Sequence, residues 1–206
     1  MSDQAKRLMG FIGNGILSYF SEDLKSNQRL LLKTPDTGNI EDYFHLFPQT
    51  KVLILIRDGR DTVESFAKSW GGLATFKRMT RRWKDRIIQL ESFQQRLNAS
   101  GMKDKYLIVK YESLNENQEG EVMKALNFIG LEPDKYPWEA LKKLPVLGSS
   151  DFRGESKEVN WKPLQKNDQF NPTGKWIEWS KGKKRTFKKI AGSELIRLGY
   201  EKDLNW

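Results

Sequence analysis

The sequence predicts an α/β sandwich with a parallel β-sheet. Nearly continuous apolar runs, typical of strands buried on both faces of such a sheet, occur at residues 29–33, 51–56 and 106–110. Apolar residues at helical spacing precede, separate and follow these runs. Strands that alternate with helices in this way define the fold class.

Four helical patterns accompany the strands. The first runs from Ala5 to Tyr19 and is weakened by three glycines. The second covers residues 73–97 and predicts one long amphipathic helix. The third ends at Gly130, which suits a left-handed C-cap, and the last covers residues 187–198.

One segment lacks a regular pattern. Residues 131–178 contain five of the seven prolines, and we interpret them as a long ordered crossing segment with short helices. No linker or internal repeat divides the chain. The sequence therefore predicts a single domain over residues 1–206, which is an ordinary domain length.

The composition excludes several classes of site. The chain has no Cys, which removes disulfides, thiolate metal ligands and cysteine nucleophiles. His45 is its single histidine, so no His-His zinc spacing exists and we expect no metal. No run of 18 apolar residues is present, and the N-terminus is too polar for a signal peptide, so we expect a cytoplasmic protein without a membrane partner.

The positive charge is concentrated near the C-terminus. The chain has a net charge of +9, and from residue 157 to the end there are 12 basic and 6 acidic residues, which gives +6. Six of these basic residues lie between positions 181 and 189. They form either a solvated helix face, with charges in water that steer anions, or a site for a polyanion such as nucleic acid or an acidic glycan. No nucleic-acid-binding motif accompanies them.

The second apolar run ends in a group of residues suited to bind an anion. Residues 57–65 read RDGRDTVES, with Asp58 and Gly59 in the turn and a helix beginning there. Arg57 supplies a planar set of donors and Ser65 a hydroxyl, which together suit a terminal phosphate. The alternative is a structural ion pair of Arg57 with Asp58 or Asp61.

An ordered set of motifs resembles the sulfotransferases that use 3′-phosphoadenosine 5′-phosphosulfate (PAPS), and most of all the branch of tyrosylprotein sulfotransferases and bacterial relatives. The motifs occur at residues 32–35 (LKTP), 43–48 (YFHLFP), 51–61 (KVLILIRDGRD), 109–114 (VKYESL), 126–131 (LNFIGL), 174–176 (GKW) and 198–200 (LGY). The resemblance implies a three-layer sandwich of the P-loop-NTPase-like sulfotransferase fold. It further implies PAPS as the sulfuryl donor.

The resemblance also assigns roles to individual residues. Arg57 and Ser65 occupy the positions that hold the 3′-phosphate in this family. Tyr111 occupies the position of a tyrosine beside the nucleotide, and Lys175 that of a basic residue that closes over the same phosphate. An ordinary core position for Tyr111 and a solvated loop position for Lys175 are the alternatives.

The chain departs from the family pattern in its first motif. Family members open with a strand and a loop, approximately Pro-Arg-Ser-Gly-Thr-Thr, whose backbone N–H groups bind the 5′-phosphosulfate. The chain resembles a member that begins after this strand. The glycine-rich residues 10–15 (GFIGNG) follow no strand and contain no Lys, Ser or Thr, so we interpret them as a helix.

The family's catalytic base is also missing from its usual positions, which hold Leu32 and Pro35 here. Lys33 is retained and could neutralise charge on the transferring sulfuryl group. Asp36 and His45 are the nearest substitutes for a base, although His45 fits a solvated helix position better.

The leading hypothesis is a PAPS-dependent sulfotransferase that acts on a hydroxyl or amine of a small-molecule, glycan or peptide acceptor. Without the phosphosulfate loop, we expect this chain to bind adenosine 3′,5′-bisphosphate and to transfer the sulfuryl group weakly or not at all. A non-catalytic nucleotide- or partner-binding protein of the same fold and a basic module that binds polyanions remain the alternatives.

Overall fold

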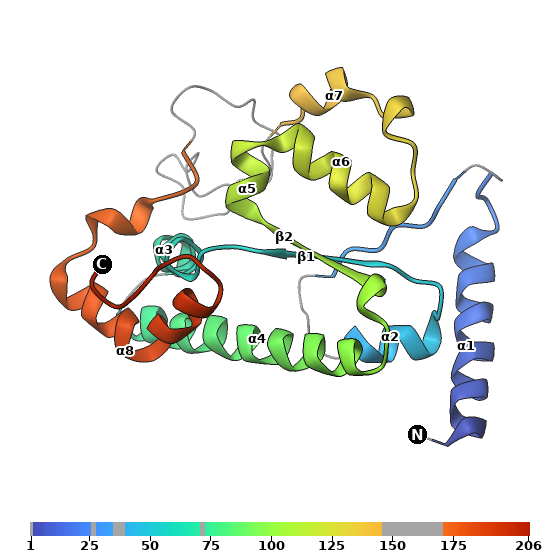
Figure 1. Ribbon diagram of the computed structural model, residues 1–206, viewed down its shortest axis with the longest axis horizontal. Coiled ribbons are helices and arrows are strands. Elements are labelled where there is room, and N and C mark those ends of the chain that lie inside the picture. The colour runs from blue at the N-terminus through green and yellow to red at the C-terminus, as the bar shows by residue number, and fades with distance from the viewer. Residues whose placement is uncertain (1, 26–27, 35–39, 71–72, 146–170) are drawn as a thin grey trace. The chain divides into compact units, whose positions relative to one another are not determined.

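The computed structural model describes residues 2–25, 28–34, 40–70, 73–145 and 171–206 (Figure 1). The chain divides into two compact units, which are considered separately here. Unit 1 comprises Met1–Ile54 and Ile88–Leu107, and unit 2 comprises Leu55–Ile87 and Ile108–Trp206.

The regular elements are mostly helices, interrupted by two strands. In chain order they are α1 (Asp3–Ser21), α2 (Ile40–Leu46), β1 (Val52–Ile56), α3 (Gly59–Trp70), α4 (Leu73–Ala99), η1 (Lys103–Lys105), β2 (Tyr106–Lys110), α5 (Tyr111–Glu116), α6 (Gln118–Ile129), η2 (Pro133–Lys135), α7 (Trp138–Lys142), η4 (Lys175–Glu178) and α8 (Lys181–Arg197). This mixture of helices and strands confirms the α/β class.

Strands β1 and β2 pair in a small parallel sheet, with α3 and α4 as the connection between them. The residues that follow the two strands also meet: the backbone N–H of Asp58 donates to Glu112 Oε1 at 2.9 Å. Because both residues lie just beyond the carboxyl end of their strand, the two strands run in the same direction. The second and third predicted strands are therefore confirmed.

Two parts of the strand prediction are wrong. Residues 29–33 form no strand, and their side chains are exposed. An apolar run becomes a strand only where a partner edge accepts its backbone hydrogen bonds, and that pairing is not encoded locally. In β1 the burial alternates instead of being continuous, with Leu53 42% and Leu55 57% exposed. The three-layer arrangement stays a prediction.

Unit 1 contains α1, whose N-terminus is capped by Ser2, and α2. The glycine-rich residues 10–15 lie inside α1, which confirms their interpretation as a helix. Gly13 is buried, and a Cβ at this position would overlap the backbone carbonyl of Leu46 in α2. The two helices can approach this closely only because position 13 has no side chain.

Aromatic packing joins the second half of α4 to the rest of unit 1. Phe93 stacks on Phe44 with ring centroids 6.3 Å apart and meets the ring of Tyr106 edge-on at 5.4 Å. Leu90 and Leu97, which lie on the same helix face as Phe93, are also buried. The predicted long amphipathic helix is confirmed.

Unit 2 has an aromatic-rich core that α3, the first half of α4, and α8 share. Its buried members are Val63, Phe76, Met79, Trp83, Ile87, Trp179, Phe187, Ala191 and Leu195. Helix α6 ends as predicted, because Gly130 adopts φ 70° and the backbone N–H of Leu131 bonds to the carbonyl of Leu126.

Across the described ranges, every helix is too short or too polar to cross a membrane.

Two glycines of α1 provide a matched test of its packing. We expect Gly13→Ala to destabilise unit 1 by about 1–3 kcal/mol, because the added methyl group has no space against Leu46. Gly10→Ala, which meets no atom within 4 Å, should instead stabilise the helix by up to about 1 kcal/mol. Thermal unfolding followed by circular dichroism measures both. Equal effects of the two substitutions would show that α1 does not pack through Gly13.

Candidate functional site

The candidate site begins where β1 turns into α3, in unit 2. The Asp58 carboxylate accepts the backbone N–H of Arg60 at 2.8 Å, while the Asp58 carbonyl accepts that of Thr62, so this residue starts the helix. Gly59 lies against the ring of Trp83, where a Cβ would overlap it. The Trp83 indole N–H donates to the Arg57 carbonyl at 3.2 Å, which holds the end of the strand in place.

Arg57 has the environment of an anion ligand. Its guanidinium carbon lies 4.8 Å from the centroid of the Tyr111 ring, and Nη2 donates to the Pro172 carbonyl. Its Nε is buried without a hydrogen-bond partner in the described part of the chain. No described carboxylate forms an ion pair with Arg57 either. The side chain is thus fixed in orientation and keeps its positive charge.

The structural ion pair proposed as the alternative for Arg57 belongs to Arg60. This guanidinium, 2% exposed, contacts the Asp58 carboxylate through Nε at 3.0 Å and Nη2 at 2.6 Å, and it also pairs with Glu201. Its flat faces meet indole rings, with centroids 3.5 Å away for Trp176 and 4.5 Å for Trp206. Arg60 therefore neutralises Asp58, so Asp58 forms no ion pair with Arg57.

Glu112 joins three segments of the motif set. Its carboxylate accepts the Asp58 N–H at 2.9 Å and the hydroxyl of Tyr200 at 3.0 Å. Burial and the neighbouring Glu112 charge raise the pKa of Tyr200, which keeps this phenol protonated as a donor. Lys110 completes the link, because its ammonium donates to the Leu198 carbonyl at 2.6 Å.

Asp61 anchors the segment that contains Lys175. Asp61 is 1% exposed, and its carboxylate accepts hydrogen bonds from the backbone N–H groups of Gly174 at 2.8 Å and Lys175 at 2.9 Å. Burial raises the pKa of Asp61, and the hydrogen bond from Gly174 opposes this rise. The Gly174–Lys175 turn is possible because Gly174 adopts φ 76°.

Glu64 gives one lysine of the basic segment a structural role. Its carboxylate accepts the indole N–H of Trp179 and pairs with the ammonium of Lys183. The same ammonium lies 5.1 Å from the Phe76 ring centroid and 4.8 Å from that of Trp179. The alternative of a solvated helix face for residues 181–189 therefore does not hold at Lys183, which helps to close the core.

The structure brings most predicted ligands of unit 2 onto neighbouring elements. Arg57 and Tyr111 are in contact, and Lys175 is held by Asp61 at the start of α3. Ser65 lies one turn beyond Asp61 in α3 and is half-buried.

The remaining candidates lie elsewhere in the chain. Lys33 is an exposed residue of unit 1, in a stretch without regular structure. His45 is half-buried in α2, and Asp36 and Pro35 lie outside the described residues. Across the described ranges, no three acidic or histidine side chains cluster in a way that could hold a metal ion.

Sequence reasoning missed Arg60 and Glu112 as organising residues. The position of Glu112 could have indicated its role, because it follows Tyr111 just after a predicted strand, at the same sheet edge as Asp58. No local signal distinguishes Arg57 from Arg60, because both flank the same turn. Their difference depends on the tryptophans and on Glu201, which are distant in sequence.

Removing one charge from Asp61 tests the anchor of the Lys175 segment. In Asp61→Asn, one of the two backbone N–H donors loses its acceptor, so we expect a loss of about 1.5–3 kcal/mol in stability. Hydrogen exchange at Gly174 and Lys175 should accelerate. The matched variant Asp104→Asn, at an exposed position, should change neither property. Unchanged exchange in Asp61→Asn would contradict the anchor.

A comparison with known proteins matches the part of the chain that contains Arg57 and Tyr111. A model of the sulfotransferase family matches residues 4–135, which is more than half of the chain and includes α1, β1, α3, α4 and β2. No curated protein matches the chain. The matched region contains the Arg57 turn and the Tyr111 strand end, where the structure builds its candidate site. The chain belongs to the sulfotransferase family.

Proposed function

We propose that this protein transfers a sulfuryl group from PAPS to a hydroxyl or amine acceptor, and that the end of β1 holds the 3′-phosphate of the donor. One observation carries the assignment. Arg57 is a fixed guanidinium with a buried, unpartnered Nε and no paired carboxylate among the described residues.

The residues around Arg57 fit a phosphate in their chemistry. Arginine offers donors in one plane, which match the oxygens of a phosphate, and Ser65 on α3 adds a hydroxyl. Lys175 adds a positive charge on a segment that Asp61 holds at the same helix start. Arg57, Ser65, Tyr111 and Lys175 are thus the residues proposed to hold PAPS, which supplies an activated sulfuryl group when bound.

Tyr111 orients the site rather than reacting. Burial raises the pKa of this phenol, so it stays neutral near pH 7 and its ring remains available to the guanidinium. The ring and the Pro172 carbonyl together limit rotation of the Arg57 side chain. A donor group fixed before binding loses less conformational entropy when the phosphate arrives.

The acceptor side of the reaction is proposed from the family relationship. Lys33, the lysine of the LKTP motif that resembles the family's, would neutralise negative charge on the transferring group. The acceptor would be a small molecule, a glycan or a peptide whose hydroxyl or amine attacks sulfur.

The Arg57 assignment predicts the behaviour of two variants. Arg57→Ala should weaken binding of adenosine 3′,5′-bisphosphate about tenfold to hundredfold, because a charge-assisted bond contributes about 1.5–3 kcal/mol. Arg57→Lys should recover part of this loss, since it keeps the charge but not the planar donors. Isothermal titration calorimetry measures both affinities.

The matched control for this experiment is Arg7→Ala, an exposed position of α1 in unit 1. It should bind the nucleotide like the wild-type chain. Wild-type affinity in Arg57→Ala, with the fold intact by circular dichroism, would remove Arg57 from the site.

For a chain of these 206 residues, sulfuryl transfer is predicted to be weak even where the nucleotide binds. Preorganised N–H donors contribute about a hundredfold to thousandfold in rate each, and the sequence offers no Arg-Ser-Gly-Thr-Thr loop to supply them. Transfer from radiolabelled PAPS to sugar, phenol and peptide acceptors measures the rate. Rapid transfer would contradict the prediction of weak activity but not the proposed reaction. In that case Lys33→Ala should lower kcat and leave nucleotide affinity unchanged.

A further inference from the structure

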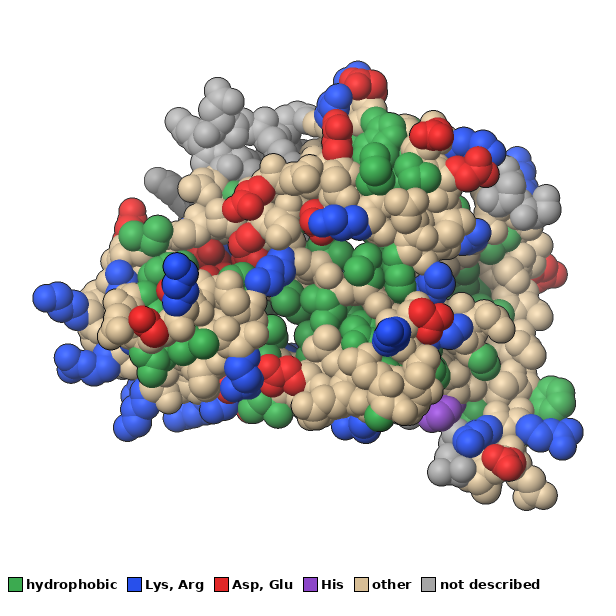
Figure 2. Space-filling view, viewed as in Figure 1, with side chains coloured by type: hydrophobic (Ala, Val, Ile, Leu, Met, Phe, Trp, Pro, Cys, Tyr) green, Lys and Arg blue, Asp and Glu red, His purple; other side chains and the backbone are tan. Residues whose placement is uncertain are grey.

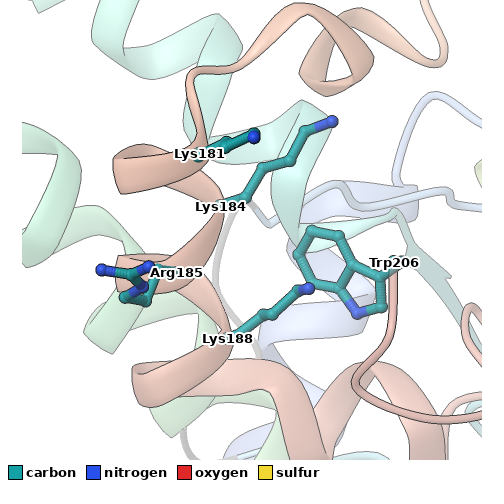
Figure 3. A pocket seen from close by; sticks show the side chains of 5 residues that line it. All are labelled: Lys181, Lys184, Arg185, Lys188 and Trp206. Atoms are coloured by element: carbon teal, nitrogen blue, oxygen red, sulfur yellow. The ribbon is translucent and has the colours of Figure 1, made fainter.

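A second cluster of positive charge surrounds a shallow pocket of about 270 Å³ in unit 2. It lies between the first half of α8 and the C-terminal residue, and its lining residues are Lys181, Lys184, Arg185, Lys188 and Trp206 (Figure 3). Figure 2 shows Lys and Arg side chains gathered over α8. Four of the five lining side chains are cationic, and none of them belongs to the Arg57 site.

Within the described residues, these four cations lack the carboxylate partners that several other lysines have. On other helices and turns, Lys6, Lys124, Lys135 and Lys142 each pair with an acidic residue three positions earlier. No such ion pair involves the four pocket cations within the described ranges. On the same helix, Lys183 does have a carboxylate partner, Glu64.

The placement of these charges is locally unfavourable. Their positions repeat at spacings of three and four residues, so like charges are neighbours on the helix surface. They also follow the N-cap Ser180 at the positive end of the helix dipole, and the first turn contains no acidic residue. Local rules that a fold breaks without compensation are found most often at functional sites.

The pocket offers donors and no acceptors from its side chains. Lysine, arginine and tryptophan side chains donate hydrogen bonds but accept none of ordinary strength. The indole nitrogen of Trp206 is buried and has no partner in the described part of the chain. Its ring already contacts Arg60 and Lys188, with centroid distances of 4.5 and 4.7 Å, so it is not a free platform for stacking a base.

We propose that this pocket is a second anion site, separate from the Arg57 site, which binds a sulfate or phosphate group. Such a group accepts hydrogen bonds from every side and supplies the negative charge that the helix face lacks. The group could arrive as a free anion or as an ester on a larger molecule. The proposal goes beyond the donor site and does not depend on PAPS binding.

The test uses the full chain and a charge-reversal pair. Lys181→Glu/Arg185→Glu changes the charge of the four residues from +4 to 2 − 2 = 0, and neither residue contacts a ring among the described residues. The matched control, Arg7→Glu/Lys25→Glu, makes the same change at exposed positions of unit 1. Sodium sulfate is titrated against sodium chloride at equal ionic strength, with the Trp206 indole N–H followed by NMR and assigned with Trp206→Phe.

We expect saturable sulfate binding at the Trp206 signal in the wild-type chain and in Arg57→Ala. The pocket variant should lose at least about tenfold in sulfate affinity, and the control less than about twofold. Without sulfate, the pocket variant should unfold at a higher temperature than the wild type, since reversal removes repulsion and favours the helix dipole. A purely structural role for these cations predicts the opposite shift.

A final comparison separates the two sources of the group. Tighter binding of N-acetylglucosamine 6-sulfate than of sulfate would assign the pocket to a sulfate ester, and equal or weaker binding to a free anion. Unsulfated N-acetylglucosamine should not bind. A response to sulfate that matches chloride, or that survives unchanged in the pocket variant, would overturn the proposal.

Discussion

The buried ion pair between Asp58 and Arg60 supports the rest of the site in unit 2. Both side chains are removed from water, and a buried charge that loses its partner is strongly destabilising. The pair also reaches Glu201 and the ring of Trp206, so it fixes the C-terminal segment against the end of β1. Because Arg60 neutralises Asp58, the neighbouring Arg57 is left without an ion pair to Asp58.

The cations of unit 2 differ in their partners. Arg60 and Lys183 have carboxylates and aromatic rings around them, and they close the core. Arg57 has a ring and a carbonyl but no paired carboxylate among the described residues. The four pocket cations of α8 likewise have no paired carboxylate among the described residues. Part of the positive charge of unit 2 is therefore structural, and the rest is the charge that the two proposed anion sites would use.

The sequence predicted local structure well where one pattern governed it. The period of apolar residues in 73–97 specified a long helix, and Gly130 specified where a helix ends, because both signals act within a few residues. The run at 29–33 carries an equally apolar pattern but forms no strand. A strand also needs a neighbour that is distant in sequence, and apolar composition does not supply one.

The candidate site was also predictable from the sequence only in its local features. The sequence alone determined that the segment after β1 begins a helix and concentrates Arg, Asp and Ser there, because turn and capping preferences are local. Only the tertiary structure decided which arginine is neutralised. The indole of Trp206 and the carboxylate of Glu201 lie about 140 residues away in sequence and select Arg60 by packing and charge. No pattern within the motif itself carries that information.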